Sequence, residues 1–242
     1  MNLQANETKL ILFDLDDTLY DFSSCWESGM REAIRLHPLT SDLDTEAFYQ
    51  RLKYYSDVLW DSYVDNTLNL DRYRRLRLDK ALGEFGKSAE TNTANDFQAF
   101  FSVQSMAMIK PLEETTILLN ELAQRYRMGI VTNGPADMTY IKLKNLGVDH
   151  LFSEKSVFIS ELVGYHKPDS RIFAHVLERM EAAPQETLFV GDTWGADVVG
   201  AMDAGIPAVW INAHGRVPES EHVPFAVIQS LGELRKYVMI EG

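Results

Sequence analysis

Residues 10–19 of the chain read LILFDLDDTL, so that four apolar residues run directly into a group of acids and a threonine. The apolar part, from Leu10 to Phe13, is typical of a strand that is covered on both faces of a parallel sheet. Such sheets bind ligands at the carboxyl ends of their strands. Acids crowded at that position need a partner cation or a raised pKa, unless they form an ordinary solvated turn. The stretch by itself leaves both interpretations open.

The composition is that of a globular protein with an excess of acids. The 242 residues are 45% hydrophobic and 24% charged, and the formal net charge is −13. This charge opposes long-range attraction to nucleic acid or to an anionic membrane, so we expect neither as a partner. The single cysteine, Cys25, is interpreted as a packed helix residue, and with a polar N-terminus it predicts a cytoplasmic protein.

Residues 20–108 are predicted to form a helical insert, because apolar residues recur there at helical spacing and strand-like runs are absent. The first helix is expected to stop near Pro38, and the second to open at residues 44–46. The third should end at Gly86, and the fourth should run from Ala94 to Met108. Four helices with short links suggest a small bundle.

From residue 109 onward the pattern alternates between helix and strand, which indicates βαβ units and a parallel sheet. The first strand precedes the bundle and its partners follow it. We therefore predict a doubly wound α/β core made of residues 1–19 and 109–242, into which the bundle of residues 20–108 is inserted. The further strands are expected at residues 128–132, 157–159, 187–190, 206–211 and 225–228.

Polar residues follow three of the later elements at positions where a parallel sheet would place a site. Thr132 ends one strand, Asp192 ends another with Asp197 five residues on, and Lys167 precedes a helix. Each has a structural alternative as a helix cap or a solvated surface residue. Because all of them are predicted at one edge of one sheet, their combination favours a shared site with Asp14.

The combination resembles the haloacid dehalogenase superfamily of hydrolases. Residues 14–18 resemble its first motif, Thr132 its second, Lys167 its third, and residues 191–197 its fourth. The resemblance covers the core from residue 9 to about residue 212, and the helical bundle stands where the superfamily carries a cap domain. It implies a Rossmann-like core, a Mg²⁺ cofactor and hydrolysis of phosphomonoesters.

The resemblance also implies ligands for the metal. Asp14 would be the nucleophile that forms an aspartyl-phosphate and a metal ligand, Asp192 a second ligand, and the backbone carbonyl of Asp16 a third. Asp197 would hold a metal-bound water or orient Lys167. Hard oxygen ligands of this kind suit Mg²⁺.

The remaining residues would handle the phosphoryl group and the protons. Thr132, the amides near Asn133 and Gly134, and Lys167 would bind the phosphoryl oxygens. Asp16 would protonate the departing alkoxide and then activate the water that frees the phosphate. Members that cleave carbon–halogen bonds lack this second acid, so Asp16 indicates phosphate transfer. Asp17 receives no role.

The resemblance defines the reaction better than the substrate. Residues 152–173, and residues 159–169 above all, are similar to the branch with pyrimidine 5′-nucleotidases, which favours a nucleoside 5′-monophosphatase of pyrimidine or broad preference. A sugar-phosphate phosphatase, of the N-acylneuraminate-9-phosphatase or phosphoglycolate phosphatase type, is the alternative. A phospho-accepting signalling module is a rival from another class, but it gives no reason for a cap.

Substrate choice is expected in the cap and just after Thr18. The candidates to stack a base are aromatic residues, although an aromatic on a bundle helix usually packs in the core: Tyr20, Phe22, Trp26, Trp60, Tyr63 and Tyr73. The arginines of residues 72–77 are interpreted as a solvated helix face paired with acids, with contact to an anionic substrate as the alternative.

Overall fold

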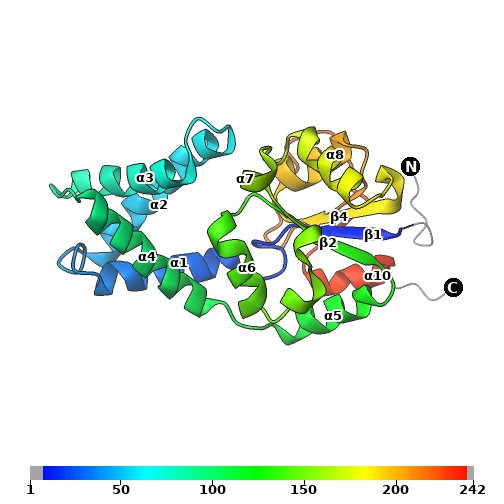
Figure 1. The fold of residues 1–242 in the computed structure, drawn as a ribbon, viewed down its shortest axis with the longest axis horizontal. Helices are drawn as coiled ribbons and strands as arrows, with labels where there is room; N and C mark the ends of the chain where they lie inside the picture. Colours follow the sequence, from blue (N-terminus) through cyan, green and yellow to red (C-terminus); the bar gives the residue numbers. More distant parts are fainter. Residues whose placement is uncertain (1–7, 239–242) are drawn as a thin grey trace. The chain divides into compact units, whose positions relative to one another are not determined.

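The computed structural model describes residues 8–238 and divides the chain into two compact units. An α/β unit contains the chain up to Asp21 and from Lys110 onward, and a helical unit contains Phe22–Ile109 (Figure 1). The first strand thus lies before the helical unit in the sequence and its sheet partners lie after it. Within residues 8–238, none of the helices is both long and apolar enough to cross a bilayer.

The α/β unit is built on a six-stranded sheet with the order β3-β2-β1-β4-β5-β6, in which every neighbouring pair is parallel. The strands are β1 (Leu10–Phe13), β2 (Arg127–Thr132), β3 (Val157–Ile159), β4 (Thr187–Gly191), β5 (Ala208–Ile211) and β6 (Ala226–Ile228). β1 is central: its Leu12 pairs with Gly129 of β2 on one side and Phe189 of β4 on the other. The predicted α/β fold class is confirmed. After β1 the chain adds β2 and β3 on one side, and from β4 onward it adds strands on the other side. The strand order therefore switches at β1, and doubly wound sheets bind ligands at such a switch point.

Helices cover both faces of this sheet. In Figure 1, α8 lies on one side of the strands and α5 and α10 lie on the other. Leu10 and Leu12 of β1 pack with Ile172, Phe173 and Val176 of α8 in a core of buried side chains. The helices of this unit are α5 (Glu113–Ala123), α6 (Ala136–Asn145), α7 (Ser160–Val163), α8 (Ser170–Arg179), α9 (Gly200–Asp203) and α10 (Arg235–Val238). Short turns of 3₁₀ helix are η2 (Asp149–Leu151), η3 (Glu154–Ser156), η4 (Pro184–Glu186) and η6 (Leu231–Leu234).

The helical unit consists of α1 (Phe22–Leu36), α2 (Thr45–Val64), α3 (Leu70–Glu84) and α4 (Thr91–Met108). The carboxylate of Asp44 caps α2 by accepting a hydrogen bond from the backbone N–H of Ala47 at 2.8 Å. Gly86 follows α3 in the left-handed conformation, with φ +68°. A Cβ added to Gly29 would lie 2.5 Å from the Cα of Ser105, so α1 and α4 cross with their backbones close together.

Some predicted boundaries shift. The fourth helix begins at Thr91, three residues before Ala94, and the strand expected from residue 206 begins at Ala208. The helix expected from about residue 196 starts as a π-helical segment, η5 (Trp194–Val199), before continuing as α9. The structure also contains α7, which the sequence did not suggest.

The arginine run of α3 divides into two environments. Arg75 is half-buried and pairs with Asp79 on the same helix at 2.8 Å, in line with the predicted pairing with acids. For Arg77 the prediction of a solvated residue is wrong, because its helical spacing places it with buried Tyr73 and Ala81. Its guanidinium donates a hydrogen bond to Gln98 at 3.0 Å and lies over the ring of Tyr73.

Candidate active site

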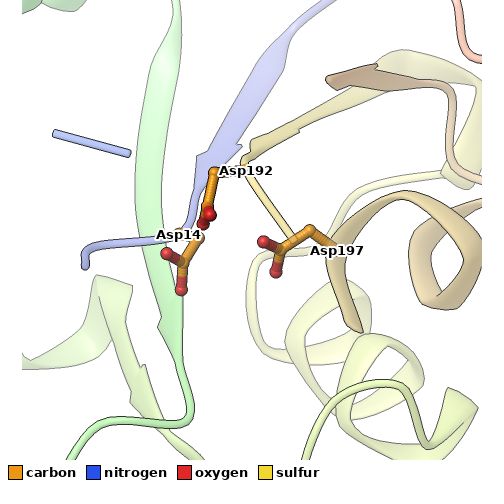
Figure 2. Close-up of side chains that lie close together, drawn as sticks. All are labelled: Asp14, Asp192 and Asp197. Atoms are coloured by element: carbon orange, nitrogen blue, oxygen red, sulfur yellow. The ribbon is translucent and has the colours of Figure 1, made fainter. Parts of the chain in front are cut away.

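Three carboxylates meet at the carboxyl edge of the sheet. Asp14 follows β1, Asp192 follows β4, and Asp197 lies in η5 (Figure 2). Each offers one oxygen within 4.8 Å of the others. The backbone N–H of Asp14 donates to the carbonyl of Val190 at 2.9 Å, which continues the β1–β4 ladder up to the site. Parallel neighbouring strands therefore bring together acids that are far apart in the sequence.

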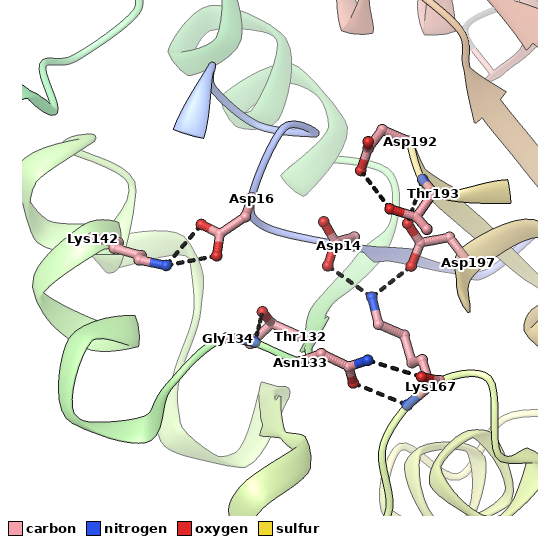
Figure 3. A network of polar contacts seen from close by, with 10 residues as sticks. All are labelled: Asp14, Asp16, Thr132, Asn133, Gly134, Lys142, Lys167, Asp192, Thr193 and Asp197. Atoms are coloured by element: carbon pink, nitrogen blue, oxygen red, sulfur yellow. Dashed lines mark hydrogen bonds and ion pairs between the residues drawn. The ribbon is translucent and has the colours of Figure 1, made fainter. Parts of the chain in front are cut away.

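Lys167 lies between two of these carboxylates. Its Nζ donates to Oδ1 of Asp14 at 2.7 Å and to Oδ1 of Asp197 at 2.6 Å (Figure 3). The side chain is only 2% exposed. Burial by itself lowers the pKa of Lys167, but Asp14 and Asp197 outweigh it, and the net effect raises that pKa. Lys167 is therefore a permanent cation in the site.

One lysine does not balance the three acids. Burial raises the pKa of Asp14 to about 7, and the neighbouring Asp197 adds to the increase while Lys167 opposes it. Burial, together with the charges of Asp197 and Asp14, raises the pKa of Asp192 to about 8. Clustered carboxylates with raised pKa values fit a divalent cation with a preference for oxygen ligands, such as Mg²⁺.

Asp197 uses both of its oxygens within the protein. Oδ1 accepts from Lys167, and Oδ2 accepts from the backbone N–H of Thr193 at 2.9 Å, which ties the first turn of η5 to its own side chain. A Cβ on Gly191 would lie 2.5 Å from the carboxylate of Asp197, so glycine is required there. These contacts leave Asp14 and Asp192 as the more available metal ligands.

Thr132, the last residue of β2, lies beside Asp14 together with Asn133 and Gly134 of the loop that follows (Figure 3). The hydroxyl of buried Thr132 accepts a hydrogen bond from the backbone N–H of Gly134 at 2.9 Å. Asn133 has a function that the sequence did not indicate: its side chain donates to the carbonyl of Lys167 at 2.8 Å and accepts from its N–H at 2.9 Å. Asn133 thus fixes the backbone that carries Lys167.

Asp16 lies apart from the three-carboxylate cluster. It lies in the loop after β1, next to Asp17, which has φ +59°, and its side chain extends toward Lys142 (Figure 3). Its Oδ1 accepts from the hydroxyl of Tyr20 at 2.8 Å, and both oxygens accept from Nζ of Lys142, at 2.8 and 2.6 Å. Of Asp16, only the backbone carbonyl remains a candidate metal ligand.

Sequence reasoning missed Lys142, which lies on α6 and is fully buried. A signal was present, since positions 138, 139, 142, 143 and 146 follow the spacing of one helix face. The other members of that face are apolar or small and buried: Met138, Thr139, Leu143 and Leu146. A lysine at a core-facing helix position requires a partner, because Lys is almost never fully buried unless paired.

The aromatic candidates occupy different environments. Tyr20 binds Asp16 through its hydroxyl. In the helical unit, Trp26 packs edge-on against Phe101 with 5.8 Å between ring centroids, and Tyr63 is buried in a stack. Trp60 is 37% exposed, and Phe22 is half-buried at the start of α1. Of these, Trp60 has the largest exposed fraction.

Comparisons with known proteins agree with this architecture. The sequence model of a family of haloacid dehalogenase-like hydrolases matches residues 8–205. The glyceraldehyde 3-phosphate phosphatase of Methanothermobacter thermautotrophicus is 30% identical over 239 residues, which cover 94% of this chain and 98% of that protein. The pyrimidine 5′-nucleotidase YjjG of Escherichia coli is 29% identical over 228 residues, which cover 93% of this chain and 96% of that protein. The structure of the HAD-hydrolase YfnB of Bacillus subtilis, bound to magnesium and described as revealing interdomain movement, matches with a TM-score of 0.82. The identity is 26%, and the match covers 96% of this chain and 99% of that one.

Proposed function

Since the chain belongs to the haloacid dehalogenase-like hydrolase family and is a phosphomonoester hydrolase, we propose that it works through an aspartyl-phosphate on Asp14. The observation that carries this mechanism is the position of Asp14 at the end of the central strand, 2.7 Å from Lys167 and beside Asp192. A second acid, Asp16, is held separately by Lys142 and Tyr20. Nucleophile and proton carrier are thus different groups in different surroundings, as covalent catalysis with acid–base assistance requires.

In the first step, a carboxylate oxygen of Asp14 attacks the phosphorus atom and the bond to the substrate alkoxide breaks. Thr132 and Lys167 hold the phosphoryl oxygens, and the Lys167 ammonium offsets their negative charge. Asp16 donates a proton to the departing alkoxide oxygen, so that a neutral alcohol leaves.

In the second step, Asp16 takes a proton from a water molecule, whose oxygen attacks the phosphorus of the aspartyl-phosphate. The bond between phosphorus and the Asp14 oxygen breaks, which releases inorganic phosphate and regenerates the carboxylate of Asp14. Each step returns Asp16 to the protonation state that the other step needs.

Asp14, Asp192 and the carbonyl of Asp16 would hold Mg²⁺, and Asp197 would support them through Lys167 and Thr193. When bound, Mg²⁺ neutralises the charge of the phosphoryl group and of the attacking carboxylate. The raised pKa values of Asp14 and Asp192 support this assignment, because burial and the neighbouring carboxylates both disfavour the ionised forms, which a bound cation would favour.

For the substrate we propose a nucleoside 5′-monophosphate, with a pyrimidine or broad preference. The similarity of residues 159–169 to pyrimidine 5′-nucleotidases supports this choice, as does the likeness over nearly the whole chain to YjjG. We further propose that the helical unit is a cap whose side chains, Trp60 among them, contact the nucleoside. The interdomain movement described for YfnB supports a mobile cap.

A small sugar or triose phosphate is the second candidate, and the 30% identity to a glyceraldehyde 3-phosphate phosphatase favours it. A phospho-accepting signalling module has no such support, because the relatives are hydrolases. We also propose a cytoplasmic location, which the single cysteine supports.

A substrate panel tests the proposal. The purified protein with Mg²⁺ is assayed for phosphate release from UMP, dUMP, AMP, glyceraldehyde 3-phosphate, phosphoglycolate and N-acylneuraminate 9-phosphate. We expect kcat/KM for a pyrimidine nucleotide to exceed that for each sugar phosphate by about tenfold or more. If kcat/KM for one of the sugar phosphates instead exceeded that for every nucleotide by about tenfold, the sugar phosphate would replace the nucleotide as the proposed substrate. Absence of turnover on every phosphomonoester would overturn the proposed reaction.

A further inference from the structure

Lys142 has no place in the mechanism above, although it is one of the largest fully buried side chains of the α/β unit. Its side chain is 0% exposed, and its Nζ lies 2.6 and 2.8 Å from the two oxygens of Asp16 (Figure 3). Removal of an ammonium from water costs several kcal/mol unless good ionic partners replace the water. The burial of the Lys142 ammonium beside Asp16, the proposed proton donor, therefore suggests that Lys142 has a role in the reaction.

The surroundings of Asp16 explain why such a contact is needed. Asp16 lies in the loop after β1, where the sheet ladder no longer fixes the chain, and the next residue adopts a left-handed conformation. Its carboxylate is oriented by donors from two places, the Tyr20 hydroxyl four residues on and Lys142 of α6. Donors from two different parts of the chain restrict the rotation of this carboxylate more than one donor alone would.

Gly134 shows where this carboxylate is held. A Cβ added to Gly134 would lie 3.0 Å from Oδ2 of Asp16, 3.1 Å from Oγ1 of Thr132 and 3.5 Å from Nζ of Lys142. The acid and the lysine therefore converge on the loop that is proposed to receive the phosphoryl group. Asp16 is held on the side of that loop where Thr132 presents its hydroxyl.

We propose that Lys142 is a positioning residue that holds Asp16 where it can transfer a proton to the leaving group. The inference rests on the proposed function, and it adds a residue outside the four motifs to the reaction. It has a specific chemical consequence: an alkoxide needs a proton in order to leave, whereas p-nitrophenolate is stable enough to leave without one. Loss of Lys142 should therefore impair alkyl phosphates much more than p-nitrophenyl phosphate.

The test compares these two substrate types through kcat/KM, which reports the steps up to transfer of the phosphoryl group to Asp14. Lys142→Met removes the ammonium and retains the length of the side chain. We expect kcat/KM to fall about 100-fold for an alkyl phosphomonoester such as UMP, and by less than about tenfold for p-nitrophenyl phosphate. Lys142→Arg retains the charge and should recover part of the loss.

Lys144→Met is the matched control, because Lys144 lies on the same helix and is exposed. It should leave both substrates unaffected. Circular dichroism and thermal melting establish that each variant is folded, and Lys142→Gln takes the place of Lys142→Met if the latter does not fold.

A double-mutant cycle with Asp16→Asn tests whether Lys142 acts through Asp16. In the Asp16→Asn background, Lys142→Met should cause no further loss of kcat/KM on UMP. Equal losses on both substrates, additive losses in the cycle, or Lys142→Met values that match those of Lys144→Met would each overturn the inference. In those cases the wild-type protein still hydrolyses phosphomonoesters, whereas a wild-type protein without any turnover would instead overturn the proposed function.

Discussion

Asp14 is the residue on which the proposed chemistry depends, and it has an almost isosteric replacement. Asp14→Asn removes the nucleophile and one metal ligand while it preserves the shape of the side chain. We expect kcat to fall on the order of 10³-fold or more, because an amide oxygen does not form the covalent intermediate. Phosphate release from the best substrate of the panel, measured with Mg²⁺, checks this outcome.

Asp17→Asn is the matched control for this substitution. Asp17 lies in the same acidic stretch, receives no role in the mechanism, and has φ +59°, a conformation that asparagine tolerates well. This variant should retain most of the activity. If Asp14→Asn and Asp17→Asn were equally active, the assignment of Asp14 as the nucleophile would be wrong.

At the residue scale, the sequence predicted those groups that follow the ends of strands. Asp14, Thr132 and Asp192 each come directly after a buried apolar run, and a parallel sheet brings such positions to one edge. Lys142 could not be paired with Asp16 in this way. The two are separated by 126 residues, and one lies in the middle of a helix, so no local pattern connects them.

Among the elements, the crossing of α1 and α4 offers a sharp test of packing in the helical unit. A Cβ on Gly29 would lie 2.5 Å from the Cα and 2.7 Å from the backbone N of Ser105, and backbone atoms do not move aside as a side chain does. Gly29→Ala should therefore separate the two helices and lower the free energy of unfolding by about 1–3 kcal/mol. Urea denaturation followed by circular dichroism measures the change.

The same substitution elsewhere in the unit should have the opposite sign. Gly83 of α3 is exposed, and a Cβ there would meet nothing within 4 Å. Gly83→Ala should raise the free energy of unfolding by about 0.5–1 kcal/mol, because alanine loses less backbone freedom in a helix than glycine does. A loss of stability in Gly83→Ala, or none in Gly29→Ala, would contradict the observed helix crossing.

At the element scale, helices and strands could be predicted where a single physical signal dominates. The capping carboxylate of Asp44 and the left-handed Gly86 mark the ends of α2 and α3, and local chemistry determines both. The π-helical segment η5 was not predicted, and it carries Asp197, whose carboxylate bonds Lys167 and the backbone N–H of Thr193. The contact between Asp197 and Lys167 joins residues that are far apart in the sequence, so the spacing of apolar residues along the chain could not predict it.

Over the molecule as a whole, the balance of charge at the sheet edge links stability, pH and metal binding. In the metal-free protein the pKa of Asp14 is raised to about 7 and that of Asp192 to about 8, mainly by burial. Their ordinary value is 3.8. Between about pH 4 and pH 8 these two carboxyls therefore bind more protons in the folded state than in the unfolded state. By linkage, the contribution of Asp14 and Asp192 to the free energy of unfolding should decrease as the pH rises through this range.

Mg²⁺ should reverse this trend, because it binds the deprotonated carboxylates and displaces their protons. At about pH 8.5, Mg²⁺ at a hundredfold excess over its dissociation constant should add about 2.7 kcal/mol of stability, or roughly 5–10 °C in Tm. At about pH 5.5 the same concentration should give less than half of that increase, since protons compete for the ligands. Thermal melting with and without Mg²⁺ at both pH values measures the difference.

Asp192→Asn should reduce the stabilisation by Mg²⁺ at both pH values, because it removes a metal ligand and a titrating group together. If Mg²⁺ raised the Tm of this variant as much as that of the wild type, the metal would bind elsewhere.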